Sequence, residues 1–376
     1  MREESTATRA THAPFRVVRA YFRLPPEPGG MEAHIARLSA AQRALGVEVL
    51  NLYNTGETEG PAVQLFAGRN LLCVRPAALR NVIFYSAALA ARRRLRGILP
   101  TVLHVHGDWS DFLYSKALAH ALGARVVAAS FHDAVTKQMA MLYRLALSHC
   151  DLVFATGKDD QNSLQELLGR PVHHLPSAPL DRFFDAPEHT AQTSCDVISV
   201  GNFFPKKRQD LVLECAVRRP NLRFAVYGDG PERESIIARA AAENISNIVF
   251  PGRCPPAQII EAMQGAKLFL LTSEKEGTPT AALEAMAVGL PVVLTPSNEY
   301  GWLVESGVNG FITRSWEVDE MIACVDSVLA DEPRRVAMSR ANRERARSHT
   351  WRANAEQVNA LMAEQLGLAW ESPCVG

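Results

Sequence analysis

The 376-residue chain lacks the features that mark several special classes of protein. Its formal net charge is zero, which argues against general binding of nucleic acid. No uninterrupted apolar run approaches the length of about 20 residues that a membrane-spanning helix needs. Residues 1–13 are polar and lack the apolar core of a secretion signal. We therefore expect a globular, cytoplasmic protein with no nucleic acid among its partners.

Cysteine is present, but not in a pattern that indicates a disulfide framework or a metal site. The seven cysteines are scattered and odd in number, and none forms a C-x-x-C pair. A reduced, intracellular protein is the simplest interpretation.

The order of apolar segments predicts two domains. A length of 376 residues is too great for one ordinary core and suits two. Strand-like and helix-like segments alternate, which predicts parallel sheets covered by helices on both faces. The alternation breaks at 176–193, where Pro, Asp and Ala accumulate, and then resumes. We predict an α/β protein with doubly wound domains at 14–183 and 195–352, and a last helix within 353–376 that is long enough to cross back to the first domain.

The individual elements can be placed by the same patterns. The expected strands are 15–22, 47–52, 101–106, 125–131, 151–155, 171–175, 196–201, 223–227, 248–250, 268–272 and 291–294. The expected helices are 31–45, 77–96, 110–122, 137–148, 159–168, 209–217, 232–243, 256–263, 280–288 and 353–368.

The most informative segment runs from Glu276 to Glu284. It follows an apolar strand, turns at 277–279 and enters the helix expected at 280–288. Carboxylates at such a place can accept hydrogen bonds from sugar hydroxyls, while the start of the helix attracts an anion. A nucleotide-activated sugar offers both groups. The alternative is that the helix dipole alone favours acidic residues there, without any ligand.

A basic loop follows the first strand of the second domain. Residues 201–208 read GNFFPKKR, which places three cations beside a helix start. Cations in that position can neutralise a diphosphate. A solvated basic turn is the alternative.

These segments carry a resemblance to a known family. Residues 272–293 resemble the E-x7-E signature of retaining glycosyltransferases of family 4. Other landmarks of that family occur in the same order over residues 15–365: Gly29-Gly30-Met31-Glu32, Phe131-His132-Asp133, the segment 175–183, Gly228-Asp229-Gly230-Pro231 and Trp351.

The resemblance implies a GT-B fold, in which two Rossmann-like domains face a cleft and the second binds the donor. Glu276 is then expected to contact the hydroxyls of the donor hexose, and Glu284 the ribose. Lys207 would contact the diphosphate, assisted by the backbone N–H groups of Thr280 and Ala281.

For the first domain, the resemblance implies binding of the acceptor, which would be a glycan, a lipid-linked molecule or a small molecule. His132 would lie near the transferred sugar and the leaving phosphate. Gly29 and Gly30 would let a loop approach the donor closely. Members of the family typically need no metal or other cofactor.

Three departures from the family pattern are visible. Asn202 stands where the family usually has Arg, so the phosphate site loses one cation, for which Lys206 or Arg208 would have to compensate. Pro279 stands where Gly is common and removes one N–H donor. The segment 175–181 lacks the usual Asn-Gly pair.

Two further groups of residues allow a functional and a structural interpretation. His104 and His106 end a strand and share one face; we favour a structural pair with satisfied hydrogen bonds. Residues 61–107 contain seven arginines and no acidic residue. Arg92, Arg93 and Arg96 can share a helix face beside Phe84, Leu89 and Leu95; this indicates either a solvated face or docking to an anionic membrane.

The sequence therefore predicts a retaining hexosyltransferase that uses a nucleotide-diphosphate sugar. The expected setting is bacterial surface polysaccharide or glycolipid synthesis, in the cytoplasm or peripherally on the cytoplasmic face of the inner membrane. The alternatives are a soluble transferase that acts on a small metabolite and a non-catalytic GT-B subunit that binds a sugar nucleotide.

Overall fold

The computed structural model describes residues 14–25, 30–132, 137–187, 194–296 and 300–373. They divide into two compact units. The described residues within 1–176 and 351–376 form the first unit, and those within 177–350 form the second. Gly29, an expected donor-binding residue, lies outside the described residues.

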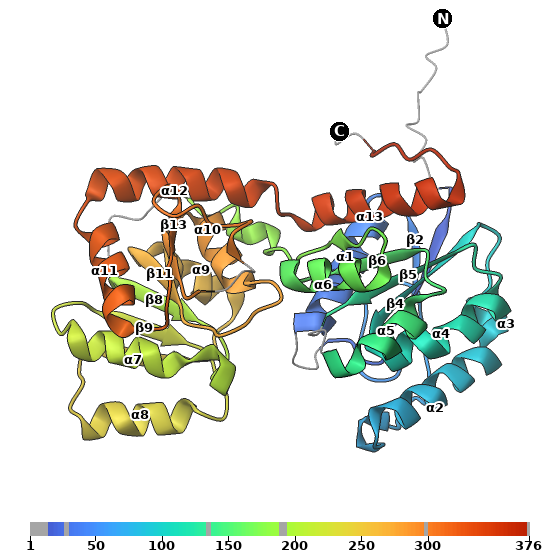
Figure 1. Cartoon of the computed structure of the whole chain (residues 1–376), viewed down its shortest axis with the longest axis horizontal. Coiled ribbons are helices and arrows are strands. Elements are labelled where there is room, and N and C mark those ends of the chain that lie inside the picture. The colour runs from blue at the N-terminus through green and yellow to red at the C-terminus, as the bar shows by residue number, and fades with distance from the viewer. Residues whose placement is uncertain (1–13, 26–29, 133–136, 188–193, 297–299, 374–376) are drawn as a thin grey trace, which may run out of the picture. The chain divides into compact units, whose positions relative to one another are not determined.

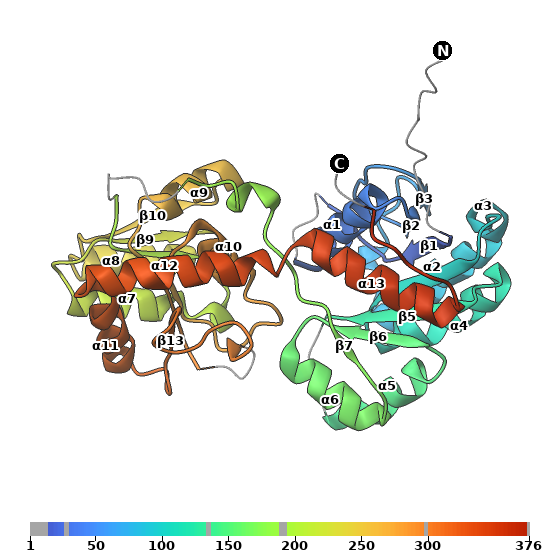
Figure 2. The same ribbon diagram turned by 90° about the horizontal axis from the view of Figure 1, so that it is seen from above.

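Within the described residues, the first unit contains a seven-stranded parallel sheet in the order β3-β2-β1-β4-β5-β6-β7. The strands are β1 (Arg16–Ala20), β2 (Glu48–Tyr53), β3 (Ala62–Gln64), β4 (Thr101–Gly107), β5 (Val126–Phe131), β6 (Leu152–Ala155) and β7 (His173–His174). Helices α1 (Gly30–Ala44) and α13 (Trp351–Leu366) lie side by side over one face (Figure 2). Helices α2 (Ala77–Ala90), α4 (Trp109–Leu122) and α5 (Ala140–Leu147) cover the other face (Figure 1).

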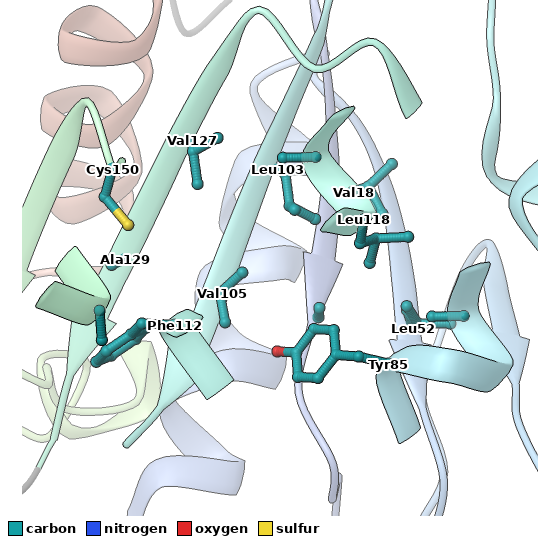
Figure 3. Close-up of a cluster of buried hydrophobic side chains, with 14 of the residues drawn as sticks. Val18, Leu52, Tyr85, Leu103, Val105, Phe112, Leu118, Val127, Ala129 and Cys150 are labelled. Carbon is teal, nitrogen blue, oxygen red and sulfur yellow. The ribbon is translucent and has the colours of Figure 1, made fainter. Parts of the chain in front are cut away.

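The two faces of this sheet differ in chemistry. The face under α2, α4 and α5 is apolar, and Figure 3 shows strand residues such as Val18, Leu103 and Val105 together with the helix residues Tyr85 and Phe112. Because side chains alternate along a strand, the neighbouring positions point to the opposite face. That face carries a buried polar group: Arg19, His104, His106 and Ser130 from the strands, Ser39 and Gln42 from α1, and Asn359 from α13.

The second unit repeats the architecture. Among the described residues its parallel sheet has six strands in the order β10-β9-β8-β11-β12-β13. They are β8 (Val197–Val200), β9 (Phe224–Tyr227), β10 (Ile248–Gly252), β11 (Leu268–Leu271), β12 (Val292–Leu294) and β13 (Gly310–Ile312). Helices α7 (Gln209–Arg218), α8 (Arg233–Ala242) and α11 (Val318–Leu329) cover one face, and α9 (Pro256–Gln264), α10 (Thr280–Val288) and α12 (Glu332–Arg347) cover the other (Figure 1).

The core of the second unit is apolar on both sides of the sheet. Along β11, Leu268 and Leu270 pack toward α7 and α11, whereas Phe269 and Leu271 pack toward α9 and α10. A parallel strand that is buried on both faces reads as a continuous apolar run, which is why the sequence revealed it.

The prediction of two doubly wound parallel α/β domains is confirmed. The expected helix 77–96 is wrong in part, because α2 ends at Ala90 and a separate short helix, α3 (Arg92–Leu95), follows. The expected helix 137–148 is an α-helix only from Ala140 to Leu147. Four elements were not predicted: the three-residue strands β3 and β13, the helix α11 and the strongly polar helix α12. The six cysteines within the described ranges form no disulfide.

Candidate functional site

In each unit the strand order reverses at one place. In the second unit this place lies between β8 and β11, because the chain runs outward from β8 through β9 to β10 and then returns to β11. In open parallel sheets, ligands bind beyond the carboxyl ends of the strands at such a switch point. The loops that follow β8 and β11 are the basic loop 201–208 and the segment 272–279, so both predicted donor segments meet there.

The turn at residues 228–231 holds the basic loop in place. The Phe203 N–H donates to Asp229 O at 3.0 Å, and the Glu232 N–H donates to Phe203 O at 3.0 Å. Gly228 has φ 138°, and a Cβ there would lie 1.9 Å from Gly201 O. Only glycine permits this backbone approach, so the turn serves to position the basic loop.

Lys207 and Glu276 form an ion pair in which both side chains are largely buried, with 18% and 11% of their side-chain surface exposed. Ser273 Oγ donates to the same Glu276 carboxylate oxygen at 2.7 Å. Thr272 Oγ1 donates to Lys207 O at 2.9 Å, so both segments are also tied through the backbone. The sheet topology thus brings together two residues that the sequence singled out separately.

The start of α10 presents a positive helix end beside this pair. Pro279 provides no side-chain cap, and the first-turn N–H groups of a helix have no intrahelical partner. One expectation needs correction: the Thr280 N–H donates to Thr278 O at 2.8 Å across Pro279, so it is already engaged. Of the two predicted N–H donors, Ala281 remains. Glu284 lies one turn into α10 and is partly buried.

Arg208, one of the two residues expected to compensate for Asn202, pairs with two carboxylates. The Arg208 guanidinium binds Asp210 at 3.1 Å and Glu274 at 3.2 Å, which engages it within the unit. Asn202 and Lys206 are both exposed. Lys207 is therefore the cation that lies beside Glu276.

In the first unit, four histidines cluster on the polar face of the sheet. His104 and His106 lie on β4, His132 directly follows β5, and His34 lies on α1. The ring centres of His34 and His132 are 5.0 Å apart, and those of His106 and His132 are 5.3 Å apart. Trp351, the residue expected before the last helix, is the first residue of α13 and contacts His34.

The hydrogen bonds assign the protons in this cluster. Arg19 Nη2 can only donate, so His104 Nδ1 accepts from it at 3.3 Å, and His104 Nε2–H donates to Ser130 Oγ at 2.8 Å. His106 Nδ1 and His132 Nε2 are 3.0 Å apart. His106 Nε2 is buried and has no hydrogen-bond partner among the described residues. A buried N–H without an acceptor is costly, so the proton belongs on Nδ1, which donates to His132.

The structural interpretation of the histidine pair is therefore correct for His104 and incomplete for His106. His104 has both ring nitrogens satisfied, whereas His106 positions His132. Burial lowers the pKa of His104 and His106 well below the usual value, and it lowers the pKa of His132 to about 3. All three rings are neutral at physiological pH.

A cavity of about 490 Å³ lies at the switch point of the first sheet, between β1 and β4. His132 lines it, together with Tyr21, Phe22, Arg23, Met31, Arg75, Arg80, Gly107, Asp108 and Asp111. Apart from His132, sequence reasoning did not assign these residues to a site. One signal was present: Asp108 and Asp111 form the capping box of α4, a pattern that is readable from their spacing.

Two of the remaining expectations concern Gly30 and metal binding. Gly30 is the first residue of α1, and a Cβ there would meet no atom of the described residues within 4 Å. In the described parts of the chain, no group of three or more His, Cys, Asp or Glu side chains has a geometry that could hold a metal ion.

Comparison with known families covers most of the chain. Residues 28–178 match the family described as Glycosyltransferase Family 4, and residues 181–345 match the one described as Glycosyl transferases group 1. The chain belongs to glycosyltransferase family 4.

Relatives within this family are distant. A sulfoquinovosyl transferase of Arabidopsis thaliana is 27% identical over 165 residues, 43% of this chain and 32% of that protein. A D-inositol 3-phosphate glycosyltransferase of Segniliparus rotundus is 31% identical over 176 residues, 44% and 38% of the two chains. The match to these two relatives thus spans about a third of their length. A GDP-mannose-dependent alpha-(1-6)-phosphatidylinositol monomannoside mannosyltransferase of Mycolicibacterium smegmatis is 27% identical over 275 residues, 65% and 72% of the chains.

Solved structures of this family's fold match nearly the whole chain. Sucrose-phosphate synthase from Thermosynechococcus elongatus superposes with a TM-score of 0.76 at 16% identity, over 94% of this chain and 99% of that one. Anabaena HepE, solved in complex with UDP and glucose, has a TM-score of 0.71 at 16% identity, over 95% and 100% of the chains. The family 4 protein thus has the GT-B fold.

Proposed function

We propose that the protein is a retaining glycosyltransferase, a hexosyltransferase that moves a hexose-type sugar from a nucleotide-diphosphate sugar to an acceptor hydroxyl. The observation that carries this proposal is the Lys207–Glu276 pair at the switch point of the second unit, beside the start of α10. A diphosphate would replace Glu276 as the partner of Lys207, with the Ala281 N–H as a further donor. Glu276 would then accept hydrogen bonds from the sugar, and Glu284 from the ribose.

The transfer follows from these contacts. The acceptor oxygen forms a bond to the anomeric carbon on the face that the diphosphate leaves, while the bond from that carbon to the phosphate oxygen breaks. The departing diphosphate takes the proton of the acceptor hydroxyl. Lys207 and the start of α10 stabilise the charge that develops on the diphosphate, without a metal ion. His132, neutral in this structure, would donate a hydrogen bond from Nδ1–H to the sugar or the leaving phosphate.

Two observations support this assignment. The basic loop is held by the turn 228–231, so Lys207 is presented on a rigid support rather than on a free surface turn. Relatives include a GDP-mannose-dependent mannosyltransferase, and the structural neighbours include proteins solved with UDP-glucose and with ADP. Retention rests on the resemblance to retaining enzymes; trapping of a covalent bond between sugar and protein would contradict the one-face transfer.

We place the reaction in surface polysaccharide or glycolipid synthesis. Relatives named for lipopolysaccharide core biosynthesis and for a phosphatidylinositol mannoside support this setting. Arg92, Arg93 and Arg96 are exposed, as docking to an anionic membrane requires. Phe84 and Leu95, however, are fully buried in the core, so docking would be electrostatic rather than an insertion of that face. The helices of the described chain include none that is long and apolar enough to cross a membrane.

A screen of sugar nucleotides tests the proposal. A thermal-shift panel of UDP-, GDP- and ADP-sugars should contain one that stabilises the protein by about 2.7 kcal/mol at 100 times its dissociation constant. Donor hydrolysis or transfer in the presence of EDTA should accompany that binding. Both Glu276→Gln and Lys207→Met should weaken binding at least tenfold, because each removes a charge-assisted contact worth about 1.5–3 kcal/mol.

The control variant is Glu243→Gln, which removes an exposed glutamate that pairs with Arg239 on α8. It should bind the donor like the original chain. Binding that leads to neither hydrolysis nor transfer with any acceptor would favour the non-catalytic alternative. Absence of binding by every sugar nucleotide would refute the proposal.

A further inference from the structure

The cavity at the switch point of the first sheet has a charge pattern that the donor site does not explain. It combines three arginines with two aspartates in one concave space, and His132 lies on its wall. Ligands of parallel α/β sheets bind at such a place. The side chains that line this cavity therefore indicate which kind of molecule binds beside His132.

Two of the arginines are available to a ligand. The Arg75 side chain is exposed and makes no hydrogen bond or ion pair with any described residue. Arg80 donates through Nε to Asn81 Oδ1 at 3.3 Å, and its guanidinium lies 4.7 Å from the centre of the Phe22 ring. Its two terminal nitrogens have no hydrogen bond within the described chain. Arg23, by contrast, is neutralised by Glu32 at 2.7 Å.

The aspartates are only partly engaged. Asp108 Oδ1 accepts from the N–H and the hydroxyl of Ser110 at 2.7 and 2.6 Å, whereas its second oxygen has no partner in the described structure. Asp111 is buried and accepts the Asp108 N–H at 3.1 Å. Burial and the charge of Asp108 raise the pKa of Asp111 to about 7, which reduces the negative charge of the cavity. Asp108 thus offers an acceptor for a hydroxyl, while Arg75 and Arg80 offer donors for an anion.

We propose that this cavity binds the acceptor as a phosphorylated polyol, with its phosphate on Arg75 and Arg80 and its hydroxyls on Asp108 and beside His132. This inference rests on the proposed function and names its acceptor class. A guanidinium presents paired N–H groups that match the oxygens of a phosphate, and two such groups can bind one phosphate together. A carboxylate accepts hydrogen bonds from hydroxyls, which explains why a cavity for an anion also contains Asp108.

The phosphate could belong to a soluble polyol phosphate or to a phospholipid headgroup, since both present the same chemistry. Calorimetric titration of the full chain with glycerol 3-phosphate and glucose 6-phosphate tests the first source. Flotation with vesicles that contain phosphatidylinositol, compared with phosphatidylcholine vesicles, tests the second. Glycerol, glucose and glucuronate serve as matched ligands without a phosphate.

Arg75→Gln and Arg80→Gln should each weaken binding of the phosphorylated ligand by about ten- to a hundredfold, because each removes a charge-assisted hydrogen bond. The matched control is Arg125→Gln, an exposed arginine at the opposite end of β5, which should bind like the original chain. Asp108→Asn should weaken the binding of glucose 6-phosphate more than that of inorganic phosphate, since the Asp108 carboxylate contacts only the hydroxyls of the ligand.

Donor binding gives a separate readout. The thermal shift by the sugar nucleotide and the hydrolysis of the donor by water should persist in Arg75→Gln, while transfer to the phosphorylated polyol should fall. The inference is overturned if both sources fail to bind, if glucuronate binds as tightly as glucose 6-phosphate, or if the arginine variants bind normally. In each case an intact response to the sugar nucleotide would leave the proposed function standing.

Discussion

The buried histidines of the first unit should make it sensitive to mild acid. His34, His104 and His106 are at most 1% exposed, and burial lowers the pKa of each well below its usual value. Among the described residues their rings face Arg19 and one another, and these positive charges also disfavour the charged form. The unfolded chain, with ordinary pKa values near 6.5, binds more protons than the folded one below that pH.

The sign and size of the effect follow from linkage. Because the unfolded state binds more protons, stability falls as the pH falls through about 6.5. Each of these three histidines, and likewise His132 with its pKa of about 3, costs about 1.6 kcal/mol between pH 6.5 and 5 if it stays neutral when folded. Asp111 acts in the opposite direction, since its raised pKa of about 7 lets the folded state bind a proton that the unfolded state lacks. The Asp111 proton restores about 2 kcal/mol of stability, which leaves a net loss of about 4 kcal/mol.

Hydrogen exchange measured by mass spectrometry at pH 6.5 and 5, corrected for intrinsic exchange rates, resolves this loss by unit. Peptides from β4 and β5 should lose about 4 kcal/mol of protection, a large share of the 5–15 kcal/mol typical of a domain. Peptides from β8 and β11 should lose less protection. Among the described residues of the second unit, His349 is the only histidine; it is partly exposed, and burial lowers its pKa to about 4.

A matched pair of variants isolates the cause. His106→Asn keeps a hydrogen-bonding group near the Nδ1 position and removes the titrating ring, so the pH dependence should shrink by about 1.6 kcal/mol over the same range. His120→Gln changes an exposed histidine on α4 and should leave it unchanged. Protection of β4 and β5 that stays constant or rises from pH 6.5 to 5 would refute the reasoning, as would an unchanged pH dependence in His106→Asn.

Three further outcomes can be checked in the second unit. Gly228→Ala should lower the free energy of unfolding of this unit by at least about 2 kcal/mol, measured by urea denaturation. The reason is that the new Cβ would lie 1.9 Å from Gly201 O, in a backbone region that alanine avoids. Gly301→Ala is the control, because a Cβ there meets no atom within 4 Å. Asn202→Arg should tighten binding of the sugar nucleotide about tenfold by supplying one more charge-assisted contact, and calorimetry that finds equal or weaker affinity would contradict this placement of the diphosphate. Arg208→Gln should weaken donor binding less than Lys207→Met does, because Asp210 and Glu274 already hold the Arg208 guanidinium, and equal losses in a titration would show that it reaches the ligand.

Much of the fold was readable from the chain because buried parallel strands produce continuous apolar runs between amphipathic helices. The strand β11 and the helix α10 were placed within one residue for this reason. Elements without that pattern were missed. The strands β3 and β13 are three residues long, and α12 is dominated by charged residues, so none of them shows a clear periodicity of apolar residues.

The candidate donor site was predicted residue by residue, but its contacts were not. The local pattern placed Lys207 and Glu276 on loops that follow strands, whereas their pairing depends on β8 and β11 being neighbours in the sheet. The engagement of the Thr280 N–H depends on the backbone angles at Pro279, and the engagement of Arg208 on the position of Glu274. Neither can be read from residue types.

The sequence alone determined the fold class and the family and predicted the residues of the candidate donor site, since each depends on local periodicity and on motifs that are contiguous in the chain. The tertiary structure decided which of these residues meet. It joined Lys207 to Glu276, placed His106 behind His132, and brought Arg75, Arg80 and Asp108 to one cavity between β1 and β4. The physical reason is that sheet order is set by long-range packing, and the order of the strands determines which loops lie at a switch point.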